Sequence, residues 1–315
     1  MNLEVSNFNY GGQAVIEGVM MRGRRYWAVA VRKANKEIIV KDGPVTSVTQ
    51  KYPILGKPLI RGSVALVEAL VFGIKCLTFS ANAYAEEETG EELSVKELVF
   101  TFGLAIVLTV GFFVVLPAFI IRLIQGAIGS NVLLNLAEGL IKISFFIAYI
   151  AGISLMKYIQ RVFQYHGAEH RTINCYEAGE ELTVANVQKH SSIHPRCGTN
   201  FILITLFMSI LVFSFFGRPP FLLRVLAHLA ILPVVAGLSY EVIRQAGKQC
   251  SHPVFKWIAA PGMALQYLTT RVPDDEQVEV AITSLKAVLE KDGAYNGRGS
   301  VIQLPTGQDA DVCKE

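Results

Sequence analysis

Charged side chains are scarce in this sequence. They make up 17% of its 315 residues, against about a quarter in soluble domains. Apolar residues make up 52%, and the mean hydropathy is +0.41. These values exclude an intrinsically disordered chain and argue against an ordinary soluble enzyme. The formal net charge is only +3, which is too small for a broad basic surface, so we expect no nucleic-acid partner.

Cysteine is also sparse. The five cysteines are far apart and form no disulfide framework of the kind found in secreted domains: Cys76, Cys175, Cys197, Cys250 and Cys313. The first residues contain neither a basic stretch nor an apolar run, so we expect no cleaved signal peptide. We find no internal repeat. The remaining class is a polytopic membrane protein that carries polar parts.

Long apolar runs predict the membrane helices, because about 20 helical residues cross a hydrocarbon core of about 30 Å. Four stretches meet this requirement: Leu98–Ile121, Leu140–Met156, Phe201–Phe216 and Phe221–Tyr240. The turn Gly217–Pro220 makes the last two a helical hairpin. Two further apolar segments contain charges or glycine and proline. We interpret Leu59–Tyr84 as an interfacial or re-entrant helix and Val254–Thr270 as a helix against the membrane surface.

The distribution of lysine and arginine predicts the orientation. With four spans, residues 1–97, 157–200 and 241–315 share one side, and ten Lys and Arg residues precede Val64. The opposite side receives only Arg122 and Arg218. Because basic loops stay in the cytoplasm, we expect a multi-pass protein of the bacterial cytoplasmic membrane, embedded in the lipid bilayer, with both termini cytoplasmic.

Local sequence patterns predict the secondary structure of the segments outside the apolar runs. Residues Tyr26–Lys33 and Glu37–Asp42 alternate with period 2 and predict a β-hairpin. The run Gly11–Arg22 predicts one strand closely approached by another backbone. Asp274–Glu290 predicts an amphipathic helix, and the tail from Asp292 is expected to be disordered.

The predicted fold is therefore a mainly α membrane bundle of about four spans, with a small N-terminal β element and a C-terminal cytoplasmic helix. Its segments are an N-terminal part (1–58), an interfacial helix with an acidic linker (59–97), a membrane domain (98–270) that contains a loop (157–200), and a C-terminal helix with its tail (271–315).

Four of the six histidines fall within residues 166–194. His166 and His170 enclose Glu169 in the sequence HGAEH, an H-x-x-E-H pattern predicted on a helix that continues the second span. Residues i and i+4 share one helix face, so both imidazoles can reach one ion. In the inverted zincin motif two such histidines bind zinc and the glutamate removes a proton from water. The alternative without a metal is a pair of interfacial histidines whose hydrogen bonds are made to one another, to a carboxylate and to water.

A catalytic zinc needs a third protein ligand. We expect His194 or Glu241 in this role, because both are predicted at span ends on the same membrane face. Cys197 is a further candidate. With His166, His170 and His194 it could instead close a structural zinc site that has no chemistry.

Four other charged residues are candidates for the site. Arg171 and Arg196 could hold an anionic substrate group, although cytoplasmic positive charge explains them equally well. Glu17 is the one acidic residue in its glycine-rich segment. His228 lies inside the fourth predicted span, where ionisable groups usually face the bundle interior.

Four segments of this chain resemble one known family: GGQAVIEGVMMRG (11–23), QYHGAEHRTINCYE (164–177), HPRCGT (194–199) and TTRVPDDEQVEVAI (269–282). They are similar to the YqhQ-like family of bacterial membrane proteins of unknown function, which are labelled predicted metal-dependent enzymes. The resemblance covers nearly the whole chain. It implies a metal and supplies no substrate.

The sequence thus favours a membrane metalloprotein, with zinc as the expected ion, acting as a hydrolase on a peptide or lipid-linked substrate near the membrane. One alternative is a non-catalytic transport or assembly factor with a structural zinc site. Another is a haem- or metal-handling protein that uses His170 and His228 from facing helices.

Overall fold

The computed structural model describes residues 10–89, 94–248 and 253–294. Most of these residues are helical, and a small antiparallel sheet lies near the N-terminus, which confirms the coarse fold prediction. The strands are β1 (Gly11–Val15), β2 (Gly18–Arg22), β3 (Tyr26–Arg32) and β4 (Ile38–Pro44). The short helices are α1 (Val48–Lys51), the 3-10 turn η1 (Pro53–Gly56) and α7 (Val184–Val187). The longer helices are α2 (Ile60–Thr89), α3 (Val95–Val110), the π-helical segment η2 (Gly111–Val115), α4 (Leu116–Ile124), α5 (Asn131–Ile153), α6 (Lys157–Glu177), α8 (Gly198–Ser214), α9 (Phe221–Lys248), α10 (Pro253–Thr269) and α11 (Asp275–Asp292).

The sheet is an antiparallel meander in the order β1-β2-β3-β4. Strands β3 and β4 form the predicted hairpin, in which Arg32 pairs with Ile38. The expectation of a single strand over residues 11–22 is wrong, because the chain reverses at Ile16 and Glu17 and forms β1 and β2. The predicted close backbone approach is confirmed at Gly12, where a Cβ atom would lie closer than 3.0 Å to the Met20 carbonyl oxygen.

The two faces of the sheet pack on different helices. Side chains alternate between the faces of a strand, so Val19, Met21, Ala28 and Ala30 join one core with α6 and α11. Their neighbours Val15, Met20, Val29 and Val31 pack on Cys76 and Ala83 of α2. The sheet is therefore covered by α6 and α11 on one side and by the C-terminal half of α2 on the other.

Helix α11 confirms the amphipathic helix predicted at residues 274–290. Asp274 caps its N-terminus, and Gln277 returns the bond in a capping box. Gly293 ends the helix with a left-handed φ of 77°. The prediction of a disordered tail from Asp292 is wrong for its first residues, because Asp292 ends α11 and accepts hydrogen bonds from the Arg24 and Arg25 amides. The rest of the predicted tail, from position 295 onwards, lies outside the described residues.

Among the described residues, four helical stretches are long and apolar enough to cross a membrane: Ile60–Ala85, Val95–Ile124, Asn131–Ile153 and Phe221–Gln245. The second consists of α3, η2 and α4 in succession. Two of the predicted spans, Leu98–Ile121 and Phe221–Tyr240, fall within these stretches, and Leu140–Met156 overlaps the third but extends three residues beyond the end of α5. The fourth, residues 201–216, corresponds to α8, whose 17 residues extend about 26 Å at 1.5 Å per residue. Helices α8 and α9 form the predicted hairpin.

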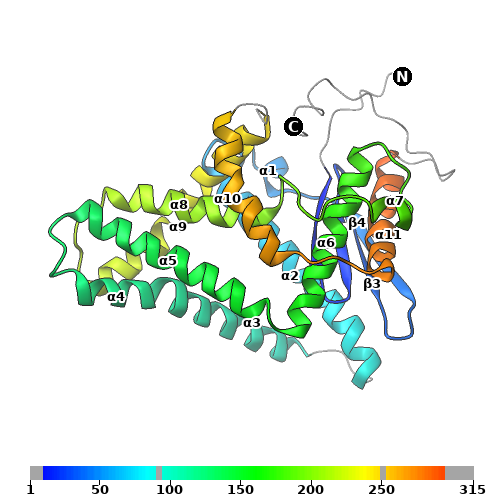
Figure 1. Cartoon of the computed structure of the whole chain (residues 1–315), viewed down its shortest axis with the longest axis horizontal. Helices are drawn as coiled ribbons and strands as arrows, with labels where there is room; N and C mark the ends of the chain where they lie inside the picture. The colour runs from blue at the N-terminus through cyan, green and yellow to red at the C-terminus, as the bar shows by residue number, and fades with distance from the viewer. Residues whose placement is uncertain (1–9, 90–93, 249–252, 295–315) are drawn as a thin grey trace.

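Helix α2 occupies the place between this bundle and the sheet (Figure 1). At its N-terminal end Arg61 forms an ion pair with Glu241 near the end of α9, and the Ser63 hydroxyl donates to the Pro233 carbonyl at 2.6 Å. Its C-terminal half packs on the sheet through Cys76 and Ala83. The two halves of α2 therefore contact the bundle helix α9 and the sheet, respectively. Its length and composition would also allow α2 to cross a membrane.

Helix α6 is a separate helix, which corrects the prediction that it continues the second span. Helix α5 ends at Ile153, and α6 begins at Lys157 after a turn that includes Ser154. The Gln160 side-chain amide donates to the Ser154 carbonyl at 3.0 Å and fixes the turn.

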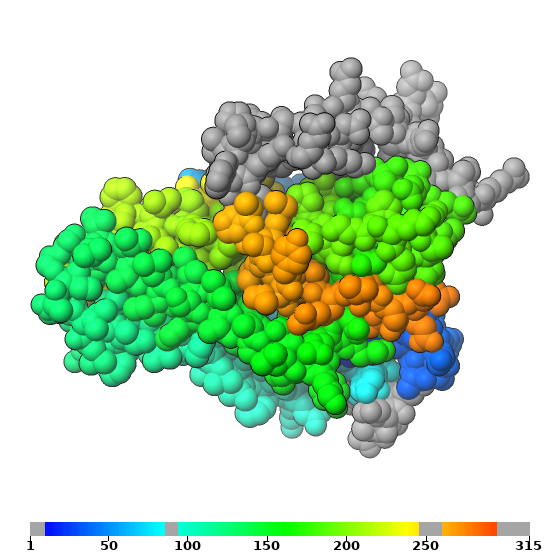
Figure 2. All heavy atoms as spheres, in the orientation of Figure 1, coloured from blue at the N-terminus to red at the C-terminus, as the bar shows by residue number. Residues whose placement is uncertain are grey.

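Figure 2 shows the bundle projecting on the left, with α10 in orange between it and the rest of the molecule.

Candidate metal centre

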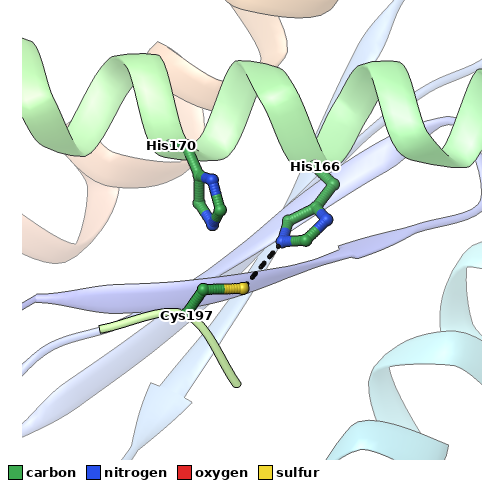
Figure 3. Close-up of side chains that lie close together, drawn as sticks. All are labelled: His166, His170 and Cys197. Atoms are coloured by element: carbon green, nitrogen blue, oxygen red, sulfur yellow. Dashed lines mark hydrogen bonds between the residues drawn. The ribbon is translucent and has the colours of Figure 1, made fainter. Parts of the chain in front are cut away.

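Helix α6 carries both histidines of the HGAEH motif on one face. The two rings lie with their centroids 4.4 Å apart and point away from the helix axis (Figure 3). His170 is buried and His166 is half-buried. The spacing of four residues thus produces the shared face that the sequence predicts.

Cys197 joins the two histidines from a different part of the chain. It is the N-cap residue of α8, and its Sγ lies 3.2 Å from His166 Nε2, as the dashed line in Figure 3 marks. The Thr199 hydroxyl lies 3.2 Å from the same sulfur and donates to it. One donor atom from each of His166, His170 and Cys197 lies within 4.8 Å of the others, so these three side chains could hold one metal ion.

Backbone carbonyls orient both imidazoles. His166 Nδ1 lies 2.8 Å from the Thr269 carbonyl oxygen, and His170 Nδ1 lies 2.7 Å from that of Ser192. A carbonyl only accepts hydrogen bonds, so in both rings Nδ1 carries the proton and Nε2 keeps its lone pair. This arrangement, with Nδ1 bonded to an outer partner and Nε2 free for the ion, is the one that metal-binding histidines adopt.

Gly167 allows this close packing. A Cβ atom at this position would lie closer than 3.0 Å to the Arg271 carbonyl oxygen. The Arg271 amide donates to the Phe163 carbonyl at 2.9 Å. The segment after α10 therefore lies directly against α6, which brings the Thr269 carbonyl to His166.

Glu169 is buried between α6 and the sheet. Its Oε1 accepts a hydrogen bond of 2.9 Å from the Gly12 amide of β1. Burial raises the pKa of this carboxyl group, while the nearby His166 and the Gly12 amide oppose the increase. The side chain is thus held in one place by the strand that the glycine-rich N-terminal motif forms.

His194 lies beside the three candidate ligands without joining them. Its ring centroid is 5.7 Å from that of His170, but its Nε2 faces Glu177 Oε2 at 3.4 Å. Burial lowers the pKa of His194, against the effect of Glu177. Arg196 forms an ion pair with the same glutamate. The sequence favoured His194 as the third ligand, whereas the structure brings Cys197 to that position.

The structure places the remaining candidates elsewhere. Glu241 pairs with Arg61, and Glu17 pairs with Arg161 at the first turns of α6. Arg171 holds the loop after α7 by donating to the Ser192 hydroxyl and the Gln188 carbonyl. In the described part of the chain, Glu241, Glu17 and Arg171 belong to no group of side chains that could hold a metal ion.

His228 belongs to a buried ionic cluster inside the bundle. Its Nε2 lies 2.9 Å from Glu138 Oε1, Arg224 reaches the same carboxylate, and the ring stacks on Phe213 at 3.9 Å. Cys197 and Phe213 lie near opposite ends of α8, so the cluster is about 24 Å from the candidate metal centre at 1.5 Å per residue. His170 and His228 therefore cannot bind the same haem.

Three features of the centre have no sequence signal. The carbonyl oxygens of Thr269 and Ser192 and the amide of Gly12 act through the backbone, so no side-chain type identifies their role. A second group of donors, Cys175, Glu180 and His190, also lies within 4.8 Å at the end of α6. There Cys175 is buried and Glu180 is exposed.

Comparison with known proteins gives the family. The model of a family described as "Protein of unknown function (DUF1385)" matches residues 57–291. The chain belongs to the DUF1385 family. A relative, "Uncharacterized protein YqhQ" from Bacillus subtilis (strain 168), is 38% identical over 297 residues, which cover 89% of this chain and 92% of the relative. The resemblance inferred from the four sequence segments is thereby confirmed.

The DUF1385 match contains all three candidate ligands, since it runs from Lys57, directly after η1, into α11. Neither the family description nor the name of the relative assigns a metal, a substrate or an activity. No solved structure matches the chain.

Proposed function

We propose that this protein is a zinc-dependent hydrolase that acts at the cytoplasmic face of the bacterial cytoplasmic membrane. The observation that carries the proposal is the set of three donors, His166, His170 and Cys197, gathered within 4.8 Å with both Nδ1 atoms bonded to carbonyl oxygens. The predicted orientation, with both termini in the cytoplasm, puts this centre on the cytoplasmic side.

The donor set suits zinc and a catalytic role. Zinc binds thiolate sulfur and imidazole nitrogen, and catalytic zinc sites have three protein ligands and one open position. The fourth ligand of a closed structural site would have to be His194, whose Nε2 faces Glu177 instead. This contact favours the open site over the structural alternative.

The surrounding residues have separate roles in the proposed reaction. A bound zinc ion supplies Lewis-acid polarisation of a carbonyl or phosphoryl oxygen. Glu169 would accept the proton that the attacking water loses, because its carboxylate is near His166 and is held in place by the Gly12 amide. Thr269 and Ser192 keep the two imidazoles in one tautomer. The substrate class is a peptide or a lipid-linked molecule, because the centre adjoins the membrane helix α8.

Metal analysis of the full chain purified in detergent tests the proposed site. We expect about one equivalent of zinc, lost in His166→Ala and Cys197→Ala. Cys76→Ala removes a thiol outside the centre and should keep the zinc. His194→Ala should also keep it, because His194 is not a ligand in this proposal. A wild-type protein without metal would contradict the zinc site, and loss of zinc in His194→Ala would favour the closed structural site.

A second experiment separates a hydrolase from a structural zinc protein. Bacterial membranes are incubated with the wild type or with Glu169→Gln, whose amide oxygen can still accept the Gly12 hydrogen bond. Mass spectrometry then compares the released peptides and the lipid composition. We expect products from the wild type only, at equal zinc content in both proteins. Identical products from both proteins would rule out Glu169 as the proton acceptor, and no products from either would contradict hydrolysis.

A further inference from the structure

A groove of about 930 Å³ lies between the sheet and α2, apart from the candidate metal centre. We refer to it as the α2–sheet groove. Its walls come from β3 and β4 on one side and from residues 68–83 of α2 on the other. It adjoins the core in which Val29 and Val31 of the sheet pack on Cys76.

The charges that line the groove are predominantly positive. Four cationic residues, Arg22, Lys33, Lys41 and Lys75, face two acidic ones. Both acidic side chains already have partners. Asp42 forms an ion pair with Lys291, and Glu68 accepts hydrogen bonds from the Ser47 hydroxyl and the Val48 amide.

Among the described residues, the cations that line the groove have no acidic partner. In the part of the chain that the structure describes, none of Arg22, Lys33 and Lys75 forms an ion pair. Lys41 lies over the ring of Phe79 at 5.1 Å. The groove therefore carries uncompensated positive charge, which is complementary to an anionic group.

The floor of the same groove is apolar and aromatic. Trp27 and Phe72 meet edge to face with their centroids 5.0 Å apart, and Phe79 and Ile39 extend this surface. Cations beside an apolar surface of this kind match an amphiphile that has a negative head group and a hydrocarbon tail. A free inorganic anion would leave the apolar part without a partner.

The groove is continuous with the apolar surface of α2. Val67, Leu70, Val71 and Ile74 follow one another at helical spacing and are 59%, 57%, 50% and 40% exposed. Ile74 also lines the groove. An exposed apolar stripe of this kind is the surface with which an interfacial helix contacts lipid. A lipid can thus reach the groove directly from the bilayer.

We propose that the α2–sheet groove binds one anionic phospholipid. Its phosphate lies among Lys33, Lys41 and Lys75, and an acyl chain lies along Phe72, Phe79 and Ile74. The site is independent of the proposed zinc hydrolysis, since it shares no residue with the candidate metal centre.

Fluorescence quenching of Trp27 tests this proposal. The sequence has two tryptophans, Trp27 and Trp257, so Trp257→Phe in the full chain leaves Trp27 as the reporter. The protein is reconstituted in vesicles that contain phosphatidylglycerol or phosphatidylcholine with brominated acyl chains at equal mole fraction. We expect saturable quenching by the brominated phosphatidylglycerol. Unbrominated phosphatidylglycerol should restore the fluorescence, and phosphatidylcholine should not.

Charge variants in the same background measure the contribution of the lysines. A basic residue near an anionic membrane surface changes affinity about fivefold, so Lys33→Gln, Lys41→Gln and Lys75→Gln together should weaken binding about 100-fold. The control removes Lys36, Lys189 and Lys286, which do not line the groove, and should leave the affinity unchanged.

Three results would overturn the proposal. Equal quenching by both brominated lipids would show that head-group charge plays no part. An unchanged affinity after loss of the three groove lysines would remove the proposed phosphate contacts. Displacement of phosphatidylglycerol by an equal concentration of inorganic phosphate would assign the groove to a free anion. The lipid competition uses no charge variant, so it decides the question even if the triple variant fails to fold.

Discussion

Replacing Gly167 with alanine is the sharpest test of how the candidate metal centre is built. The new methyl group would lie closer than 3.0 Å to the Arg271 carbonyl oxygen, so α6 or the segment after α10 has to move. Such overpacking costs about 1–3 kcal/mol. Loss of the bond from the Arg271 amide to the Phe163 carbonyl adds about 1 kcal/mol. The better helix propensity of alanine returns about 1 kcal/mol.

The net expectation is a loss of about 1–3 kcal/mol of stability and weaker zinc binding, because the Thr269 carbonyl would move away from His166. The assay combines thermal unfolding in detergent with zinc titration. Gly103→Ala is the matched control, since Gly103 lies within α3 and nothing is within 4 Å of its added Cβ. A Gly167→Ala protein with wild-type Tm and zinc affinity would refute this account of the packing.

Three further predictions concern stability. Glu138→Gln should lower the free energy of unfolding by about 3–5 kcal/mol, because it leaves Arg224 and His228 without their buried carboxylate. Thermal unfolding in detergent measures the effect, and a Tm within error of the wild type would contradict a net favourable cluster. Asp274→Ala should lower the free energy of unfolding by about 1 kcal/mol through loss of the α11 N-cap, whereas Asp275→Ala at the next position should lower it less. Equal losses of stability in the two variants would argue against the cap. Removal of the metal with a chelator should lower the Tm of the wild type and leave that of His166→Ala unchanged, since a ligand that binds the folded state stabilises it by mass action. An equal shift in both proteins would place the metal elsewhere.

Several elements followed from local sequence patterns. The alternation at residues 26–42, the acidic start and apolar spacing at residues 274–290, and the apolar runs near residues 98–121 and 221–240 each correspond to observed elements. These signals are local, because a strand face, a helix cap and an apolar run of sufficient length are properties of neighbouring residues. The reversal at Ile16 and Glu17 was missed, since the segment lacks the glycine or asparagine pair that marks a tight hairpin turn.

The sequence by itself determined that the chain has helices long and apolar enough to cross a membrane and that His166 and His170 share one face of a helix, because composition and a spacing of four residues decide both. The choice of Cys197 as the third donor was decided by the tertiary structure. Cys197 is 27 positions beyond His170 in the sequence, and it reaches the two imidazoles only because the start of α8 packs beside α6. His194 and Glu241 have the same ligand chemistry, but their contacts with Glu177 and Arg61 engage them elsewhere. Spacing along one helix is a local property, whereas the packing of α8 and α10 against α6 depends on the whole chain.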